Sequence, residues 1–269
     1  MNDFQFRQFI KNGFNEASVG YDNPAMRFFD KTAEHLVSSL LLKGNEHVLD
    51  IATGTGKLAR ELLKRLPQGH VDALDLSEGM LSHAQETLKK FSNVNFHCVD
   101  VNDAQFSKNS FDGLCSSFGV FFWPNMQATL EQLLSFLKPG GFFAMTSFFD
   151  GSFMPLSEKC LKRFEAYDLK LPKSYTWQKL DSLEKHHDLL KSVGLKNITS
   201  HRKAMGYDLK DPEEWWDIVR YTGFRSFLNQ LSEVQVKQYK EEHLQEIMAH
   251  MTDQGIYLNV DVIFTIANK

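Results

Sequence analysis

Val48-Leu49-Asp50-Ile51-Ala52-Thr53-Gly54-Thr55-Gly56-Lys57-Leu58-Ala59 begins as an apolar run with an acid near its end, passes through a turn with two glycines, and resumes as a helical pattern. This order predicts a buried strand that leads through a tight turn into a helix. The backbone N–H groups at the start of such a helix are free to hold a nucleotide-like ligand. Glycine suits the turn because a Cβ would keep the ligand away from the backbone.

The glycine pattern alone leaves three interpretations open. Gly54-x-Gly56-x-x-Ala59 also fits the fingerprint of dinucleotide-binding proteins, and Asp75 lies at nearly the distance expected for their ribose-binding acid. A strand, turn and helix without any ligand would show the same letters. The rest of the chain has to decide among these interpretations.

Strand and helix patterns alternate from the glycine turn to residue 148. We expect strands at residues 48–51, 70–74, 94–98, 113–117 and 142–148. We expect helices at residues 25–42, 57–66, 78–90 and 126–137. Strict alternation of this kind predicts a parallel sheet with right-handed crossovers.

The alternation ends after residue 148. The sequence predicts in turn an irregular aromatic segment (149–178), a helix (180–193), a strand (198–204), an all-helical insertion (206–258) and an antiparallel strand at the sheet edge (260–267). Asp211-Pro212 and Ser232 with Gln235 are typical starts of capped helices. We therefore expect lid helices in residues 1–44, a Rossmann-like core in 45–204 plus 259–269, and a helical cap in 205–258.

Composition excludes several classes of function. The 269 residues carry a net charge of −4 and no basic stripe, so we expect no nucleic-acid partner. No apolar run reaches the roughly 20 residues that span a bilayer, the start of the chain does not read as a signal peptide, and the three cysteines lack a paired spacing. These features predict a cytoplasmic protein. The 23 phenylalanines indicate either a Phe-rich core or an apolar substrate pocket.

Five motifs in order resemble the class I S-adenosylmethionine-dependent methyltransferases. Asp50-x-Ala52-x-Gly54-x-Gly56 is similar to their acid-x-Gly-x-Gly-x-Gly pattern, with Ala52 in place of the first glycine. Asp75 matches their ribose acid, and Asp100-Val101 their adenine contact. Residues 111–125, Phe-Asp-Gly-Leu-Cys-Ser-Ser-Phe-Gly-Val-Phe-Phe-Trp-Pro-Asn, resemble the fourth-strand motif of the ubiquinone/menaquinone-biosynthesis-like branch (methyltransferase domain 11 type), and Leu137-Lys138-Pro139-Gly140-Gly141 its turn before the fifth strand.

The resemblance implies a seven-stranded doubly wound sheet with its last strand antiparallel, S-adenosylmethionine as cofactor, and methyl transfer to a small apolar, aromatic or acidic molecule. The implied cofactor-binding residues are Tyr21, Asp50, Ala52, Thr53, Gly54, Gly56, Asp75, Leu76, Met80, Asp100, Val101, Ser116, Ser117 and Phe118. Ser117 stands where similar sequences often carry Gln. Tyr21 belongs to the expected lid, and its alternative role is that of a packing tyrosine.

Candidate acceptor-binding residues are aromatic and cationic: Trp123, Trp177, Trp216, Arg220 and Arg225. Trp216 and Arg220 are four residues apart on an expected helix and are therefore neighbours. The alternative is that the aromatic residues of the cap are core and that Arg225 pairs with a carboxylate. No general base can be assigned, because His186 and His187 lie within a helix where we expect exposure to solvent, and His97 is expected to be structural. No His/Cys/Asp cluster has the spacing of metal ligands, so we expect no metal.

Two other function classes remain. A non-catalytic protein that binds adenosylmethionine or a nucleotide would have the same fold, and its cap would leave no cavity beside the methyl group. An NAD(P) oxidoreductase would be stabilised by nicotinamide cofactors.

Overall fold

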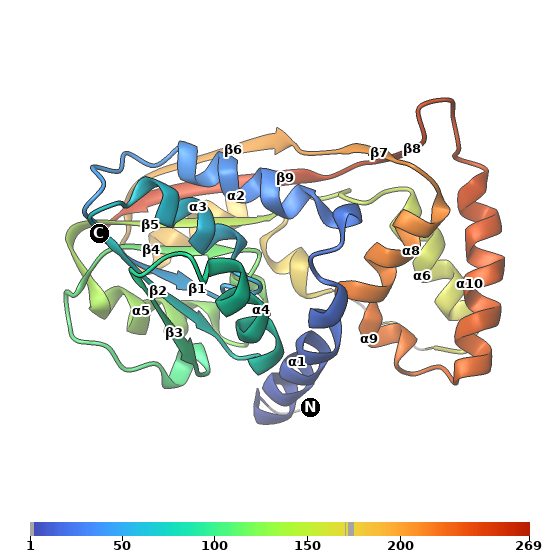
Figure 1. Ribbon diagram of the computed structural model, residues 1–269, viewed down its shortest axis with the longest axis horizontal. Helices are drawn as coiled ribbons and strands as arrows, with labels where there is room; N and C mark the ends of the chain where they lie inside the picture. The colour runs from blue at the N-terminus through green and yellow to red at the C-terminus, as the bar shows by residue number, and fades with distance from the viewer. Residues whose placement is uncertain (1–2, 170, 172–174) are drawn as a thin grey trace.

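The computed structural model describes residues 3–169, 171 and 175–269, and its centre is a seven-stranded sheet (Figure 1). The strand order is β3 (Val94–Cys98), β2 (His70–Asp75), β1 (His47–Ile51), β4 (Phe111–Ser117), β5 (Leu137–Phe148), β9 (Asp261–Asn268) and β6 (Lys196–Ala204). Only β9 runs antiparallel to its neighbours in this sheet. The predicted Rossmann-like fold is therefore confirmed.

The position of the last strand differs from the prediction. β9 lies between β5 and β6 instead of at the edge, and the edge strand is β6. An edge position would leave one side of β9 unpaired, whereas its residues 261–265 are all buried. β5 also begins earlier than predicted, because Leu137 already pairs with Phe111 across the Pro-Gly-Gly turn.

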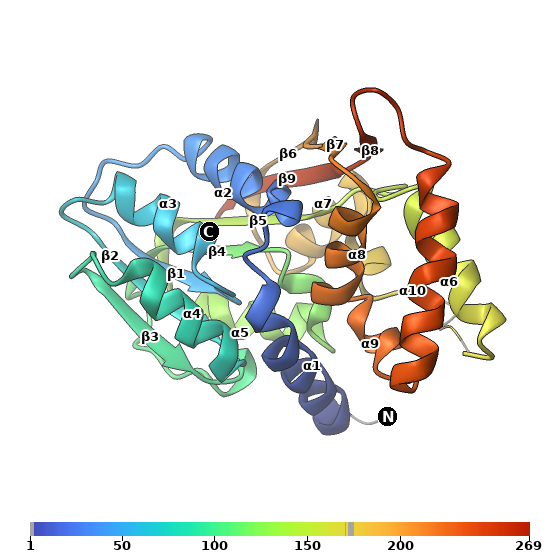
Figure 2. The same ribbon diagram turned by 45° about the vertical axis from the view of Figure 1, so that its right-hand side comes forward.

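Helices cover both faces of the sheet (Figures 1 and 2). α2 (Phe28–Ser38), α3 (Lys57–Arg65) and α4 (Glu78–Leu88) pack in a row, and α5 (Met126–Phe136) and α7 (Leu183–Ser192) contact each other. Each buries one apolar face against the strands, as Leu58, Leu62 and Leu63 do in α3. The 3-10 turns are η1 (Ser18–Gly20), η2 (Pro24–Met26), η3 (Val101–Asp103), η4 (Val120–Phe122) and η5 (Thr176–Leu180).

A second group of helices gathers at the end of the sheet opposite the C-terminus, on the right in Figure 1. It contains α6 (Leu156–Ala166), α8 (Pro212–Tyr221), α9 (Arg225–Leu228) and α10 (Glu233–Met248). Asp211 caps α8 by accepting a hydrogen bond from Glu214 N, and Ser232 with Gln235 forms a capping box at α10. Both predicted helix starts are thus confirmed.

Three elements of this region were not predicted. α6 lies in the segment expected to be irregular, and it packs against α10. The expected all-helical insertion contains strands at both its ends, β7 (Tyr207–Leu209) and β8 (Ile256–Leu258), which pair as a two-stranded sheet. Three-residue strands are too short to show an alternating pattern in sequence. Among the described residues, no helix has the length and apolar character needed to cross a membrane.

His186 is fully buried, contrary to the expected exposure. Its Nε2 lies 2.6 Å from Ser147 Oγ on β5, and its Nδ1 lies 2.7 Å from Thr265 Oγ1 on β9. The helical pattern of α7 does not show that His186 is buried, because the hydroxyl groups that pair with its ring come from strands distant in the sequence. Burial lowers the pKa of His186 from 6.5 to about 4.

The lowered pKa of His186 makes stability depend on pH. Neutral His186 stabilises the fold fully above pH 6.5, and this contribution is lost as the pH falls from 6.5 towards 4, because the unfolded chain binds the proton first. His186→Gln, which cannot titrate, should reduce the slope of the unfolding free energy in this range by up to about 1.4 kcal/mol per pH unit. Denaturant titrations at pH 7, 5.5 and 4.5 measure the slope. Exposed His187→Gln is the control, and an unchanged slope in His186→Gln would refute the assignment.

Gly56 and Gly54 provide a second test of packing. Both have positive φ, but a Cβ on Gly56 would lie 3.1 Å from Leu88 Cδ1 and 3.2 Å from Ala84 Cβ, whereas a Cβ on Gly54 would meet nothing within 4 Å. Gly56→Ala should lower the free energy of unfolding by roughly 2–3 kcal/mol, because the new methyl group strains the backbone and also pushes α3 away from α4. Gly54→Ala should lower it by about 1 kcal/mol, because only the backbone strain applies there. Equal losses in urea unfolding would contradict this packing.

Candidate functional site

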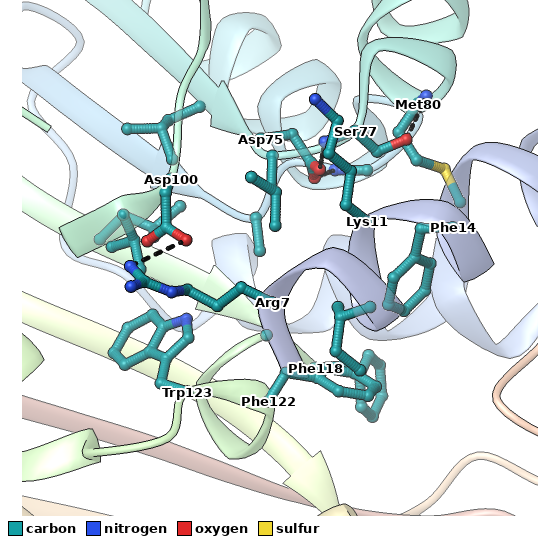
Figure 3. A pocket seen from close by; sticks show the side chains of 18 of the residues that line it. Arg7, Lys11, Phe14, Asp75, Ser77, Met80, Asp100, Phe118, Phe122 and Trp123 are labelled. Atoms are coloured by element: carbon teal, nitrogen blue, oxygen red, sulfur yellow. Dashed lines mark hydrogen bonds and ion pairs between the residues drawn. The ribbon is translucent and has the colours of Figure 1, made fainter. Parts of the chain in front are cut away.

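The carboxyl ends of β1, β2 and β4 surround a cavity that α1 (Asp3–Ala17) covers (Figure 3). Phe6, Ile10 and Phe14 of α1 line it on one side. Parallel strands place the residues that follow them at one edge of the sheet, which is the usual ligand-binding position in such folds.

Asp75 ties the two central loops of this edge together. Its Oδ2 accepts a hydrogen bond of 2.8 Å from Gly54 N, and its Oδ1 accepts one of 2.9 Å from Ser77 N. Burial raises the pKa of the carboxyl above its usual value. Each carboxylate oxygen can accept more than one hydrogen bond, so Asp75 keeps acceptor capacity towards the cavity that it lines.

Asp50 lies beneath the glycine loop and does not line the cavity. Its Oδ2 accepts a hydrogen bond of 2.6 Å from Thr53 Oγ1, while its buried Oδ1 has no hydrogen-bond partner among the described residues. Burial, together with the nearby charge of Asp75, raises the pKa of Asp50 to about 7. A cationic group bound against the loop would favour its ionised form.

Asp100 sits at the start of η3, where its Oδ1 accepts hydrogen bonds from the backbone and side-chain nitrogens of Asn102. Arg7 of α1 reaches across the cavity, and one guanidinium nitrogen lies 3.4 Å from Asp100 Oδ2 (Figure 3). Sequence reasoning did not single out Arg7. The only signal was the helical spacing of Phe6, Phe9 and Ile10, which showed an amphipathic helix but not its partner.

Tyr21 forms part of the cavity wall between α1 and the glycine loop. Its ring stacks on Phe29 at a centroid distance of 5.1 Å and contacts Phe14 edge-on. Burial, with the charges of Asp75 and Asp22, raises the pKa of the phenol. Asp22 accepts a hydrogen bond of 2.7 Å from Thr55 Oγ1, which attaches this segment to the loop.

Most residues predicted to bind the cofactor line this cavity: Tyr21, Ala52, Gly54, Asp75, Leu76, Met80, Asp100, Val101, Ser117 and Phe118. Four others, Asp50, Thr53, Gly56 and Ser116, do not line it. Gly56 instead allows α3 to pack on α4, and Ser116 is fully buried. Trp123, predicted to contact the acceptor, lines this first cavity.

A second cavity adjoins the first. The two share four lining residues, Phe14, Tyr21, Phe118 and Phe122. The other aromatic residues of the second cavity are Phe28, Phe29, Phe121, Phe148, Phe149, Phe153, Tyr175, Trp177 and Phe224. Among its described lining residues the only charged side chains are Asp150 and Asp181, and none is Lys, Arg or His.

The phenylalanines of the second cavity are mostly ones that sequence reasoning did not name individually. Phe148 stacks on Phe118 at 4.4 Å, and Phe153 contacts Phe148 edge-on at 4.9 Å. The high number of phenylalanines was the available signal, but it fits a core equally well. Trp177, a candidate acceptor-binding residue, lines this cavity and stacks on Tyr175 at 4.4 Å.

Three residues predicted to contact the acceptor line neither cavity. Trp216 is buried against Tyr239 of α10, Arg220 is exposed, and Arg225 pairs with Glu16 of α1 at 3.2 Å. The α8 face that carries Trp216 turns towards the interior of the cap, where neighbouring Trp215 donates a hydrogen bond of 2.8 Å to His243 Nε2. Helical spacing predicted that Trp216 and Arg220 are neighbours, but not which side of the helix meets the cavity.

Comparison with known proteins agrees with this geometry. Residues 48–141 match the methyltransferase domain family. The ubiquinone/menaquinone biosynthesis C-methyltransferase of Geotalea daltonii is 25% identical over 207 residues, which cover 70% of this chain and 84% of that protein. The malonyl-[acyl-carrier protein] O-methyltransferase of Halalkalibacterium halodurans is 33% identical over 164 residues, covering 56% of this chain and 59% of that protein.

A structural likeness extends to nearly the whole chain. Phosphoethanolamine N-methyltransferase 2 of Haemonchus contortus, solved with S-adenosyl-L-methionine, matches with a TM-score of 0.61 at 19% identity, over 98% of this chain and 60% of that one. Among the curated relatives compared, the chain spans from 27% to 84% of their length. Residues 48–141 of the chain thus form a methyltransferase domain of the kind that uses S-adenosylmethionine.

Proposed function

We propose that this protein transfers a methyl group from S-adenosylmethionine to a large, uncharged, aromatic or otherwise apolar acceptor. The main support for this proposal is the second cavity, which shares four aromatic lining residues with the first cavity, where we place the cofactor. An acceptor held there would lie next to the methyl group, and its apolar surface would be removed from water.

The first cavity suits the parts of the cofactor. Asp75 would accept hydrogen bonds from the ribose hydroxyls, and Asp100 one from the adenine amino group. Leu76, Met80 and Val101 would pack on the adenine, while Ala52 and Gly54 would lie against the amino acid part. Ser117 and Phe118 would then face the methyl group from the end of β4.

The sulfonium of the cofactor supplies the electrophile, so the protein has to align the acceptor and exclude water. Orientation of two reactants can contribute on the order of 7–11 kcal/mol to the lowering of the barrier. The rings of Phe14, Tyr21, Phe118 and Phe122 would enclose the space between donor and acceptor. Asp181 is already paired with Lys185 at 2.7 Å, and Asp150 is exposed, so neither is placed as a general base.

The charges of the second cavity distinguish between the two acceptors that the relatives' names suggest, a quinone ring and a malonyl group. A malonyl group carries a carboxylate, and Asp150 and Asp181 of the second cavity would repel it without a compensating cation among the described lining residues. A quinone or quinol ring is uncharged, and aromatic side chains can stack on it. We therefore favour a ring acceptor of this kind over an acidic acyl group.

The alternatives are less consistent with the site. A non-catalytic binding protein would not need an open cavity beside the methyl position, and the second cavity provides one. An NAD(P) enzyme is disfavoured by the methyltransferase relatives. The division into lid, core and cap, the lack of a nucleic-acid partner and the cytoplasmic location stay predictions.

The ribose assignment can be tested with Asp75→Ala. The variant should bind S-adenosylhomocysteine at least tenfold more weakly, which is about 1.4 kcal/mol, because both the ribose and the Gly54 and Ser77 amides lose an acceptor. Isothermal titration calorimetry measures the affinity. Asp103→Ala, an exposed acid near the cavity, should stay within twofold of the wild type. Unchanged affinity in Asp75→Ala would remove Asp75 from the cofactor site.

The acceptor class can be tested by S-adenosylhomocysteine release with lipophilic quinols and with a malonyl thioester. We expect turnover with the quinols only. Trp177→Ala should lower kcat/KM for the quinol about tenfold while leaving the affinity for S-adenosylhomocysteine unchanged, because Trp177 lines only the acceptor side. Trp216→Phe, outside both cavities, is the matched control. Turnover of the malonyl thioester, or equal effects of both tryptophan variants, would contradict the proposal.

A further inference from the structure

A cluster of three histidines surrounds one carboxylate on the sheet, away from both cavities. His47 is the first residue of β1, His70 the first of β2, and Asp72 follows two residues after His70 on the same face. His97 of β3 also reaches Asp72, with its Nε2 2.5 Å from Oδ1. The cluster therefore joins three adjacent strands.

The donor atoms of His47, His70 and Asp72 lie within 4.8 Å of one another. His47 Nε2 contacts Asp72 Oδ2 directly. Metal–ligand distances of roughly 2.0–2.2 Å in a tetrahedral site require donor atoms about 3.3–3.5 Å apart. Rotations of the imidazole side chains by a modest amount would bring the three atoms to that separation.

His70 is the residue that an ion pair alone does not explain. Its buried Nε2 finds no hydrogen-bond partner among the described residues. A buried imidazole nitrogen without a partner is costly. The existing pairs of Asp72 with His47 and His97 account for the carboxylate, but leave His70 without a role.

We propose that His47, His70 and Asp72 bind one divalent transition-metal ion of the zinc class, with water in the fourth position. Two imidazoles and one carboxylate are a donor set that Zn²⁺ accepts. The His47 side chain is 35% exposed, which gives an ion access, while Asp72 is only 6% exposed. His97 would orient the carboxylate from outside the metal's own ligands, as partners of metal-binding carboxylates do.

A bound ion would stabilise the sheet and would take no part in methyl transfer. His47 begins β1, whereas the cofactor cavity begins at Ile51, four residues or roughly 13 Å further along the strand. An ion there would cross-link β1 and β2, the two strands whose far ends lead to Ala52 and Asp75. We expected no metal from sequence spacing alone, whereas these residues come together through strand pairing.

The test uses the full chain, without an affinity tag and stripped of metal by a chelator, titrated with ZnCl₂ in a calorimeter. We expect one ion per chain with micromolar or tighter affinity, and a rise in the midpoint of thermal unfolding. His70→Gln should lower the affinity at least tenfold. Because His70 Nε2 has no hydrogen-bond partner among the described residues, the variant should unfold without metal at the same temperature as the wild type.

Two comparisons keep the result unambiguous. His187→Gln, an exposed histidine elsewhere, should bind zinc as the wild type does. Co²⁺ in place of Zn²⁺ should give the visible absorption of a four-coordinate site, and Asp72→Asn should abolish it. Absence of stoichiometric binding, or equal affinity in His70→Gln and the wild type, would show that the cluster is an ion pair only.

Discussion

The hydrogen bonds that Asp75 accepts from Gly54 N and Ser77 N are the interaction on which the site depends. One buried carboxylate at the end of β2 fixes the loop after β1 and the start of α4 at the same time. Thr53 N also donates a hydrogen bond of 3.0 Å to Leu74 O, so the loop is held to β2 at two points while Asp75 still lines the cavity.

The second organising feature is the aromatic wall shared by the two cavities. Phe14 comes from α1, Tyr21 from the end of η1, Phe118 from just after β4, and Phe122 from η4. Segments far apart in the chain thus meet where a methyl group would pass between donor and acceptor. Because the same rings line both cavities, α1 and the segment after it help to form both.

Sequence patterns predicted the elements whose signals are local. The glycine turn, Asp75 and the caps at Asp211 and Ser232 each follow from a few adjacent residues. The missed features depend on tertiary packing: β9 inserts between two strands, Arg7 crosses to Asp100, and His186 is buried by hydroxyls of other strands. Trp216 and Arg220 were placed on a real helix, but the period of a helix does not show which face meets a cavity.

A crystal structure with S-adenosylhomocysteine tests the central claim most directly. The account predicts the ribose hydroxyls within hydrogen-bond distance of Asp75, the adenine near Asp100, and the sulfur facing the aromatic wall shared with the second cavity. The ligand bound elsewhere, or a first cavity left empty at saturating ligand while the protein is folded, would contradict it.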